Sequence, residues 1–102
     1  MPLAVFTTLD DEPAARALAR AAVERNLAAC VHIERIDSVY AWQGEVHEDP
    51  EIRLLFKTSA AAYDRLAAFV LEEHPYDTPA LWAYDMARGH GPFLDWIDES
   101  TG

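Results

Sequence analysis

The sequence predicts an α+β sandwich in which two helices cover one face of a four-stranded antiparallel sheet. Two observations lead to this fold class. Residues 27–58 alternate apolar and polar side chains along two long arms that meet at a glycine, which is typical of a β-hairpin. On each side of this hairpin lies a segment with helical apolar spacing and, beyond it, a short apolar run. The element order is therefore β-α-β-β-α-β with a terminal helix, which is the ferredoxin-like arrangement.

The first expected strand covers residues 3–8, which are apolar on both faces. Asp10 and Asp11 then offer side-chain oxygens for a helix N-cap, and Pro13 falls in the first turn, where its missing N–H costs little. The apolar stripe of this helix consists of Ala15, Leu18, Ala19, Ala22 and Val23. We expect Asn26 to end the helix in the left-handed conformation.

The hairpin that follows turns at residues 43–45 and is unusually long. Arms of about 13 residues span about 40 Å at 3.3 Å per residue, whereas a 100-residue domain has a radius of gyration of only about 13 Å. The hairpin therefore extends beyond its own core unless it bends. Residues 37–38 and 49–50 are the expected bends, because the second pair contains a proline that donates no ladder bond. The outer half, with Tyr40 and Trp42, needs another surface to pack on, and a neighbouring subunit is the simplest source.

The second half of the chain repeats the helix and strand pattern. Ser59 is expected to cap a helix that stops at His74, because Pro75 follows. The buried side of this helix consists of Tyr63, Leu66, Ala67, Phe69 and Val70. Residues 81–86 form the last expected strand and residues 93–99 a short final helix. The strands at residues 3–6 and 81–86 are apolar on both sides, whereas the two helices cover only one sheet face. The sequence therefore predicts a homo-oligomer with closed symmetry that covers the other face.

The composition excludes several classes of protein. The 102 residues suffice for one domain, residues 1–102, with its own core. A net charge of −10 argues against a nucleic-acid partner, because phosphate contacts need clustered Lys and Arg. No apolar run approaches the roughly 18 residues of a membrane span and no targeting signal opens the sequence, so we expect a cytoplasmic protein with no membrane partner. A single cysteine, Cys30, excludes an internal disulfide and a four-cysteine zinc site.

A few side chains are candidates for metal chemistry. Cys30 and His32 are two apart on a strand and so share a face, as a metal-binding pair requires, although a free cysteine is more often a small buried apolar residue. His74 ends a helix with Asp77 close enough in sequence to share a cation; the alternative is a helix-terminal histidine that bonds a free carbonyl. The carboxylates of residues 45–51 also suit a cation, but a solvated cluster that protects the strand edge is the simpler interpretation.

Aromatic residues offer a second kind of site. Trp42, Tyr76, Trp82 and Trp96 are candidates to line a small-molecule cleft, although large aromatic residues are more often part of a core or an interface. The sequence has no phosphate-binding glycine-rich loop, nucleophile elbow or HExxH helix. We therefore do not expect an enzyme.

Five short motifs, in the same order along the chain, closely resemble those of the divalent-cation tolerance (CutA) proteins. The motifs are residues 26–31 (NLAACV), 39–45 (VYAWQGE), 55–58 (LFKT), 74–79 (HPYDTP) and 93–96 (FLDW). The resemblance extends from Leu3 to about Ile97. It implies a ferredoxin-like subunit in a homotrimer whose sheets continue across subunit boundaries. It also implies a role in tolerance of divalent metals, copper foremost.

The resemblance also implies site residues. The motif positions on this chain are Cys30, Tyr40, Trp42, Lys57, His74, Tyr76 and Trp96. His74 is the implied ligand for weakly held Cu(II) or another divalent cation, with no organic cofactor. Asp77 matches the acidic residue usual after the HPY motif, and Cys30 is a further metal candidate. Thr7 stands where some members carry a ligand cysteine, which weakens the expected binding, and His32 either replaces that donor or simply packs.

A second interpretation follows from the architectural similarity of such trimers to the PII signalling proteins. In it the chain is a signalling or scaffolding trimer that binds a small molecule or a partner protein in clefts between subunits. Those clefts would be lined by Trp42, Lys57, Tyr76 and Trp96, and any response to metals would be indirect.

Overall fold

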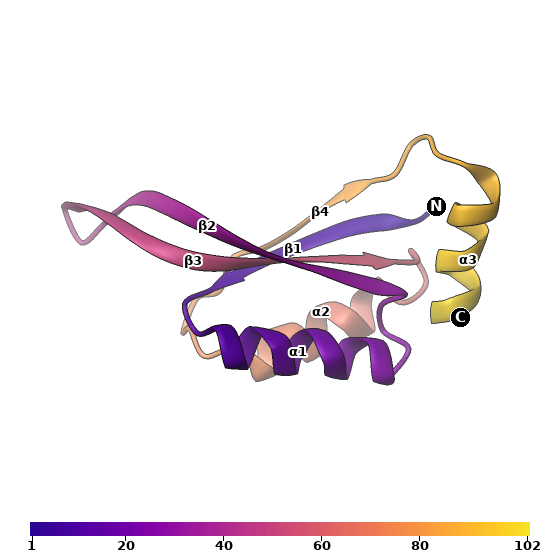
Figure 1. Cartoon of the computed structure of the whole chain (residues 1–102), viewed down its shortest axis with the longest axis horizontal. Coiled ribbons are helices and arrows are strands. Elements are labelled where there is room, and N and C mark those ends of the chain that lie inside the picture. Colours follow the sequence, from indigo (N-terminus) through magenta and orange to yellow (C-terminus); the bar gives the residue numbers. More distant parts are fainter.

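All 102 residues are described by a computed structural model, which has the expected element order. The elements are β1 (Leu3–Leu9), α1 (Glu12–Glu24), β2 (Cys30–Trp42), β3 (Glu45–Thr58), α2 (Tyr63–Glu73), β4 (Leu81–Asp85) and α3 (Gly91–Thr101). The four strands form one antiparallel sheet in the order β2-β3-β1-β4. Helices α1 and α2 lie together on one face of the sheet, and α3 stands at the end that also holds the N-terminus (Figure 1). The predicted α+β, ferredoxin-like fold is confirmed.

Helix α1 follows its predicted pattern except at its two ends. Pro13 lies in the first turn, but Asp11 occupies the N-cap in an extended conformation without a side-chain cap bond, so the predicted cap oxygens are not used. Asn26 has a φ of 59°, and the Leu27 N–H donates to the Ala22 carbonyl at 2.9 Å. This is the predicted left-handed helix end. Val23 was expected on the buried stripe, but it is 40% exposed because the helix turns it past the edge of the core.

The hairpin is continuously paired over its whole length. Its register runs from Cys30 opposite Lys57 to Trp42 opposite Glu45, and residues 37–38 and 49–50 pair with each other without interrupting the ladder. The ladder therefore continues through the positions of the predicted bends. Gln43 and Gly44 have φ angles of 51° and 80°, as a tight two-residue hairpin turn requires.

Only the inner half of the hairpin belongs to the sheet core. Strand β1 pairs with β3 from Leu3 opposite Thr58 to Leu9 opposite Ile52, so beyond Ile52 the hairpin is a two-stranded ribbon. This ribbon projects from the body of the subunit (Figure 1) and gives the molecule its long axis of 45 Å, against 25 and 21 Å in the other directions. Its exposed apolar side chains are Val39, Tyr40, Trp42 and Val46.

The second half differs from prediction mainly in its boundaries. Helix α2 begins at Tyr63 rather than at Ser59, whose hydroxyl instead accepts the Ala62 N–H at 3.1 Å in the preceding turn. The helix ends at Glu73, and His74, its predicted last residue, is the C-cap. Strand β4 stops at Asp85, and α3 is longer than predicted at both ends. Thr101 in its last turn is buried, and its hydroxyl hydrogen-bonds both the Ile97 carbonyl and the Ser59 hydroxyl at 2.8 Å, which anchors the added turn.

The core lies between the sheet and the two helices. It contains side chains from alternate positions of β1 and β3, including Val5, Leu54 and Phe56, which are fully buried. The opposite face of the sheet is not covered by any helix, and there Phe6 stacks on Trp82 with ring centroids 5.2 Å apart. Strands β1 and β4 are thus apolar on both sides, as predicted. No helix is long and apolar enough to cross a membrane.

Candidate functional site

One cleft gathers four of the eight predicted site residues. It has a volume of about 520 Å³ and lies where the outer ribbon leaves the sheet, between the end of β1 and the loop that follows α2. The lining residues are Thr8, Asp10, Tyr40, Trp42, Glu51, Tyr76, Asp77, Thr78 and Ala80. We call this feature the acidic cleft, because Asp10, Glu51 and Asp77 line it and no lysine or arginine does.

Hydrogen bonds fix the two tyrosines of the cleft. The Tyr76 hydroxyl donates to a Glu51 carboxylate oxygen at 3.2 Å, and the Tyr40 hydroxyl donates to Asp49 at 2.7 Å. Burial and the nearby negative charge of Glu51 raise the pKa of Tyr76 well above its ordinary value. The hydrogen bond to Asp49 is the main cause that raises the pKa of Tyr40. Both phenols therefore stay neutral, and the carboxylates alone set the charge of the cleft.

His74 lies beside the cleft and holds its loop in place. Its side chain is only 7% exposed. Its Nδ1 accepts the backbone N–H of Tyr76 at 3.1 Å, which leaves the ring proton on Nε2 for donation to the Thr8 carbonyl at 2.8 Å. The ring thus ties the residues that carry Tyr76 and Asp77 to the end of β1. This matches the alternative of a histidine that bonds a backbone carbonyl. A role as a metal ligand stays a prediction, and it requires the loss of one of these two bonds.

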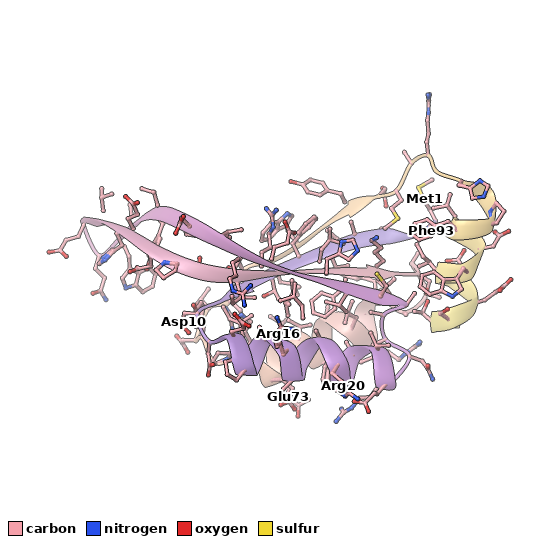
Figure 2. All side chains as sticks on the ribbon, viewed as in Figure 1. Met1, Asp10, Arg16, Arg20, Glu73 and Phe93 are labelled. Atoms are coloured by element: carbon pink, nitrogen blue, oxygen red, sulfur yellow. The ribbon has the colours of Figure 1, made fainter.

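The remaining predicted residues lie at the other end of the sheet, which we call the lysine end: Cys30, His32, Lys57, Phe93 and Trp96. Cys30 pairs with Lys57, which in turn pairs with Ala4 near the start of β1. His74 bonds Thr8, four residues further along that strand, or about 13 Å away. Figure 2 shows Phe93 beside α3 and Asp10 near the start of α1, at the opposite end of that helix layer, with the hairpin ribbon extending beyond Asp10. Within one subunit, Lys57 and Trp96 therefore do not line a cleft with Tyr40, Trp42 and Tyr76.

The lysine end has its own set of contacts. The Lys57 ammonium donates to His32 Nε2 at 3.2 Å and lies 5.3 Å from the centre of the Phe93 ring. Trp96 stacks on Phe93 with ring centroids 6.0 Å apart. Cys30 is half-buried. An ammonium group that occupies the lone pair of His32 works against a cation bound by Cys30 and His32.

The three predicted metal candidates therefore do not converge. His74 and Asp77 are both at the acidic cleft and Cys30 is at the lysine end. No group of three or more His, Cys, Asp or Glu side chains is close enough to hold a metal ion within one subunit. Sequence reasoning missed Asp10 and Glu51 as cleft residues. The sheet register would have identified them. Leu9 pairs with Ile52, and Asp10 follows Leu9 in the sequence while Glu51 precedes Ile52.

Comparisons with known proteins agree with the fold and the motifs. The profile of the CutA1 divalent ion tolerance protein family matches residues 3–100. The divalent-cation tolerance protein CutA of Thermus thermophilus is 46% identical over 99 residues, which cover 96% of both chains. The human protein CutA is 38% identical over 99 residues, but these cover 96% of this chain and only 55% of the human protein. The chain thus spans about half the length of that relative.

Solved structures give the same assignment. The Thermus thermophilus CutA1 structure superposes with a TM-score of 0.94 at 45% identity and covers 100% of both chains. CutA from Synechococcus elongatus gives a TM-score of 0.95 at 35% identity, covering 99% of this chain and 90% of that one. On the family profile, the identity to relatives and the shared structure, the chain belongs to the CutA1 divalent ion tolerance family.

Proposed function

We propose that this member of the family binds a divalent cation, Cu(II) in preference, in the acidic cleft, and that it does so as a homotrimer. The observation that carries the proposal is the presence of Asp10, Glu51 and Asp77 in one cleft that contains no lysine or arginine. Clefts lined by one sign of charge raise the local concentration of the opposite ion. A binding role, rather than a catalytic one, would thus link the structure to cation tolerance.

The donor atoms support weak binding. Carboxylate oxygens accept many divalent ions, and for a given set of ligands copper binds more tightly than zinc. The subunit holds no preassembled group of three ligands, so the ion would keep much of its water shell. His74 is the nearest nitrogen donor and would join only by releasing Tyr76 or Thr8. The donors therefore fit a loosely held ion and do not fit a tight copper centre.

Exposed apolar surface supports the homotrimer. The ribbon carries Trp42, which is 60% exposed, and on the uncovered sheet face Phe6 contacts both Trp82 and Tyr84. Burial of such surface against other copies is favourable, and closed symmetry limits the assembly. Light scattering on the purified protein tests this proposal, and a monomer at micromolar concentration would contradict it.

Calorimetric titration of the apo protein with Cu(II) and with Zn(II) at near-neutral pH tests the metal site. We expect saturable binding that is tighter for Cu(II) and at least about tenfold weaker in Asp77→Asn, because the variant removes a ligand. Asp98→Asn is the matched control, since it removes the same charge from an exposed position on α3. Equal binding by wild type and both variants would refute the cleft as the site.

The paramagnetic resonance spectrum of bound Cu(II) tests His74 separately. An imidazole ligand adds nitrogen hyperfine structure to the spectrum, whereas carboxylate oxygens do not. If His74 is a ligand, that structure disappears in His74→Ala and persists in His32→Ala and His47→Ala. If carboxylates alone hold the ion, the spectrum of the wild type shows no such structure.

A second candidate function is a signalling or scaffolding trimer that binds a small molecule or partner protein. The three aromatic side chains of the cleft, Tyr40, Trp42 and Tyr76, favour it. A thermal-shift screen tests this candidate, because a ligand that binds only the folded protein raises its melting temperature. If no compound raises the melting temperature, this candidate loses its support.

A further inference from the structure

We propose that the acidic cleft binds a small organic cation, namely an ammonium group carried on an apolar body, through its aromatic side chains as well as its carboxylates. This inference deepens the second candidate function and uses the same cleft as the metal proposal, but it does not depend on metal binding. The supporting features are the size of the cleft, the composition of its walls, the rigidity of its rings and its free carboxylates.

The size and walls of the cleft suit an organic ligand better than a bare ion. A volume of about 520 Å³ falls in the range of roughly 300–1,000 Å³ that is typical of small-molecule sites. Tyr40, Trp42 and Tyr76 supply three aromatic rings in this one cleft. Aromatic rings are not ligands for a divalent metal ion. An ammonium group, by contrast, is attracted to the face of an aromatic ring, and the apolar part of the same ligand is stabilised by packing against one.

The rings are held in place before any ligand arrives. Tyr40 donates to Asp49 and also stacks on His47, with ring centroids 5.4 Å apart. Tyr76 donates to Glu51 and lies edge-on to His74 at 4.8 Å. In Tyr40 and Tyr76, therefore, a hydrogen bond holds the hydroxyl group and a histidine ring packs against the aromatic ring. Such preorganisation reduces the entropy that a ligand must overcome.

Free carboxylates complete the site. Neither Asp10 nor Asp77 takes part in any of the four ion pairs of the subunit, which involve Glu12, Glu24 and Glu34. Both are exposed and so accessible to a ligand. Because no lysine or arginine lines the cleft, an anion finds no partner there. The walls thus select for positive charge on a molecule with apolar surface.

Calorimetric titration with three ligands that share one ring and differ in charge tests this inference. The ligands are 2-phenylethylamine, neutral 2-phenylethanol and anionic 3-phenylpropionate, titrated into the apo protein in metal-free buffer. We expect saturable binding of the amine alone. Asp77→Asn should weaken it about tenfold, the loss expected when a charged hydrogen bond is removed. Trp42→Leu should weaken it also, because it keeps apolar bulk but removes the aromatic face, whereas Asp98→Asn should leave it unchanged.

Each contrary result overturns the inference in a recognisable way. Equal binding of the amine and the alcohol would mean that charge plays no role. Equal weakening by Asp77→Asn and Asp98→Asn would mean that the amine responds only to net charge. An unaffected Trp42→Leu would mean that the aromatic face plays no role, provided that light scattering shows the same assembly state. Copper titration of the wild type separates the proposals: binding of Cu(II) but not of the amine overturns this inference alone, whereas binding of the amine but not of Cu(II) overturns only the metal proposal.

Discussion

The two ends of the sheet carry opposite chemistry although the same strands join them. Where β1 ends, three carboxylates and three aromatic rings surround the acidic cleft, and His74 ties the loop of the cleft to the strand. Where β1 begins, Lys57 donates to His32 and lies over Phe93. One end is thus suited to cations, whereas the other already holds one. Residues that belong to a single series of motifs therefore serve two separate regions, and variants at one end should leave the other unchanged.

The largest difference between the ends is expected for their histidines. His74→Ala should lower the free energy of unfolding by about 2–4 kcal/mol, because it leaves two backbone groups unbonded and opens a cavity. His32 is exposed and bonds only Lys57, so His32→Ala should cost less than about 0.5 kcal/mol. Urea unfolding at one protein concentration measures both. Similar losses for the two variants would show that His74 does not anchor the cleft.

The next largest effect is expected at the lysine end. The buried Thr101 hydroxyl hydrogen-bonds the Ile97 carbonyl and the Ser59 hydroxyl, and the variant Thr101→Val keeps its shape but removes both bonds. We expect a loss of about 1–2 kcal/mol in the free energy of unfolding. Binding of Cu(II) and of 2-phenylethylamine at the acidic cleft should be unchanged. A parallel loss of ligand affinity would show that the two ends are coupled, and Ser100→Ala is the control on the same helix.

A smaller effect is expected from Tyr76 in alkaline solution. Its folded-state pKa is raised above the ordinary value of 10.0, so its contribution to stability is full below pH 10 and is lost as the pH rises through the folded-state pKa. One such group changes the free energy of unfolding by at most about 1.4 kcal/mol per pH unit, and partial exposure to solvent reduces this. Tyr76→Phe should therefore destabilise less steeply than wild type above pH 10.

Thermal melting across this alkaline range measures the difference between wild type and Tyr76→Phe. Tyr63→Phe is the matched control, because it removes the same hydroxyl from the first residue of α2, outside the cleft. If Tyr76→Phe follows the wild type, then the cleft does not hold the phenol in its neutral form.

Local patterns in the sequence predicted the fold because each element depends on its own spacing. The hairpin alternation, the helix stripes and the left-handed Asn26 are properties of neighbouring residues, and the structure confirms them. The predictions were wrong where contacts between residues far apart in the sequence determine a helix boundary or the burial of a side chain. Helix α3 extends to Thr101 because that side chain bonds Ser59, which is 42 residues away. Val23 follows the stripe of α1 but lies past the edge of the core.

The candidate site was harder to predict because it depends on register. Tyr40, Trp42, Tyr76 and Asp77 were identified from motifs, and the structure places all four in one cleft. The sequence could not show that Lys57 lies apart from these four residues, since the order of the motifs does not reveal which end of the sheet each residue occupies. The missed cleft residues, Asp10 and Glu51, flank the pair Leu9 and Ile52, which becomes known only when β1 is aligned with β3.

The smallest expected effect distinguishes paired from free carboxylates at the cleft end itself. Glu12 begins α1 and accepts from Arg16 at 3.0 Å and from Arg35 at 2.8 Å, whereas Asp10, two residues earlier, forms no ion pair. The hydrogen bond from Arg16 is the main cause that lowers the pKa of Glu12. Its stabilising contribution is therefore full above the ordinary value of 4.5 and is lost as the pH falls through the lower folded-state pKa.

Melting curves between neutral and acidic pH should accordingly fall slightly less steeply in Glu12→Gln than in wild type. Molar salt should remove the difference, because the pair is exposed and screened. Asp10→Asn should instead weaken binding of the cation. If Glu12→Gln weakens that binding as strongly as Asp10→Asn does, then the arginines do not neutralise Glu12. The whole acidic surface, rather than the cleft, would then attract the ligand.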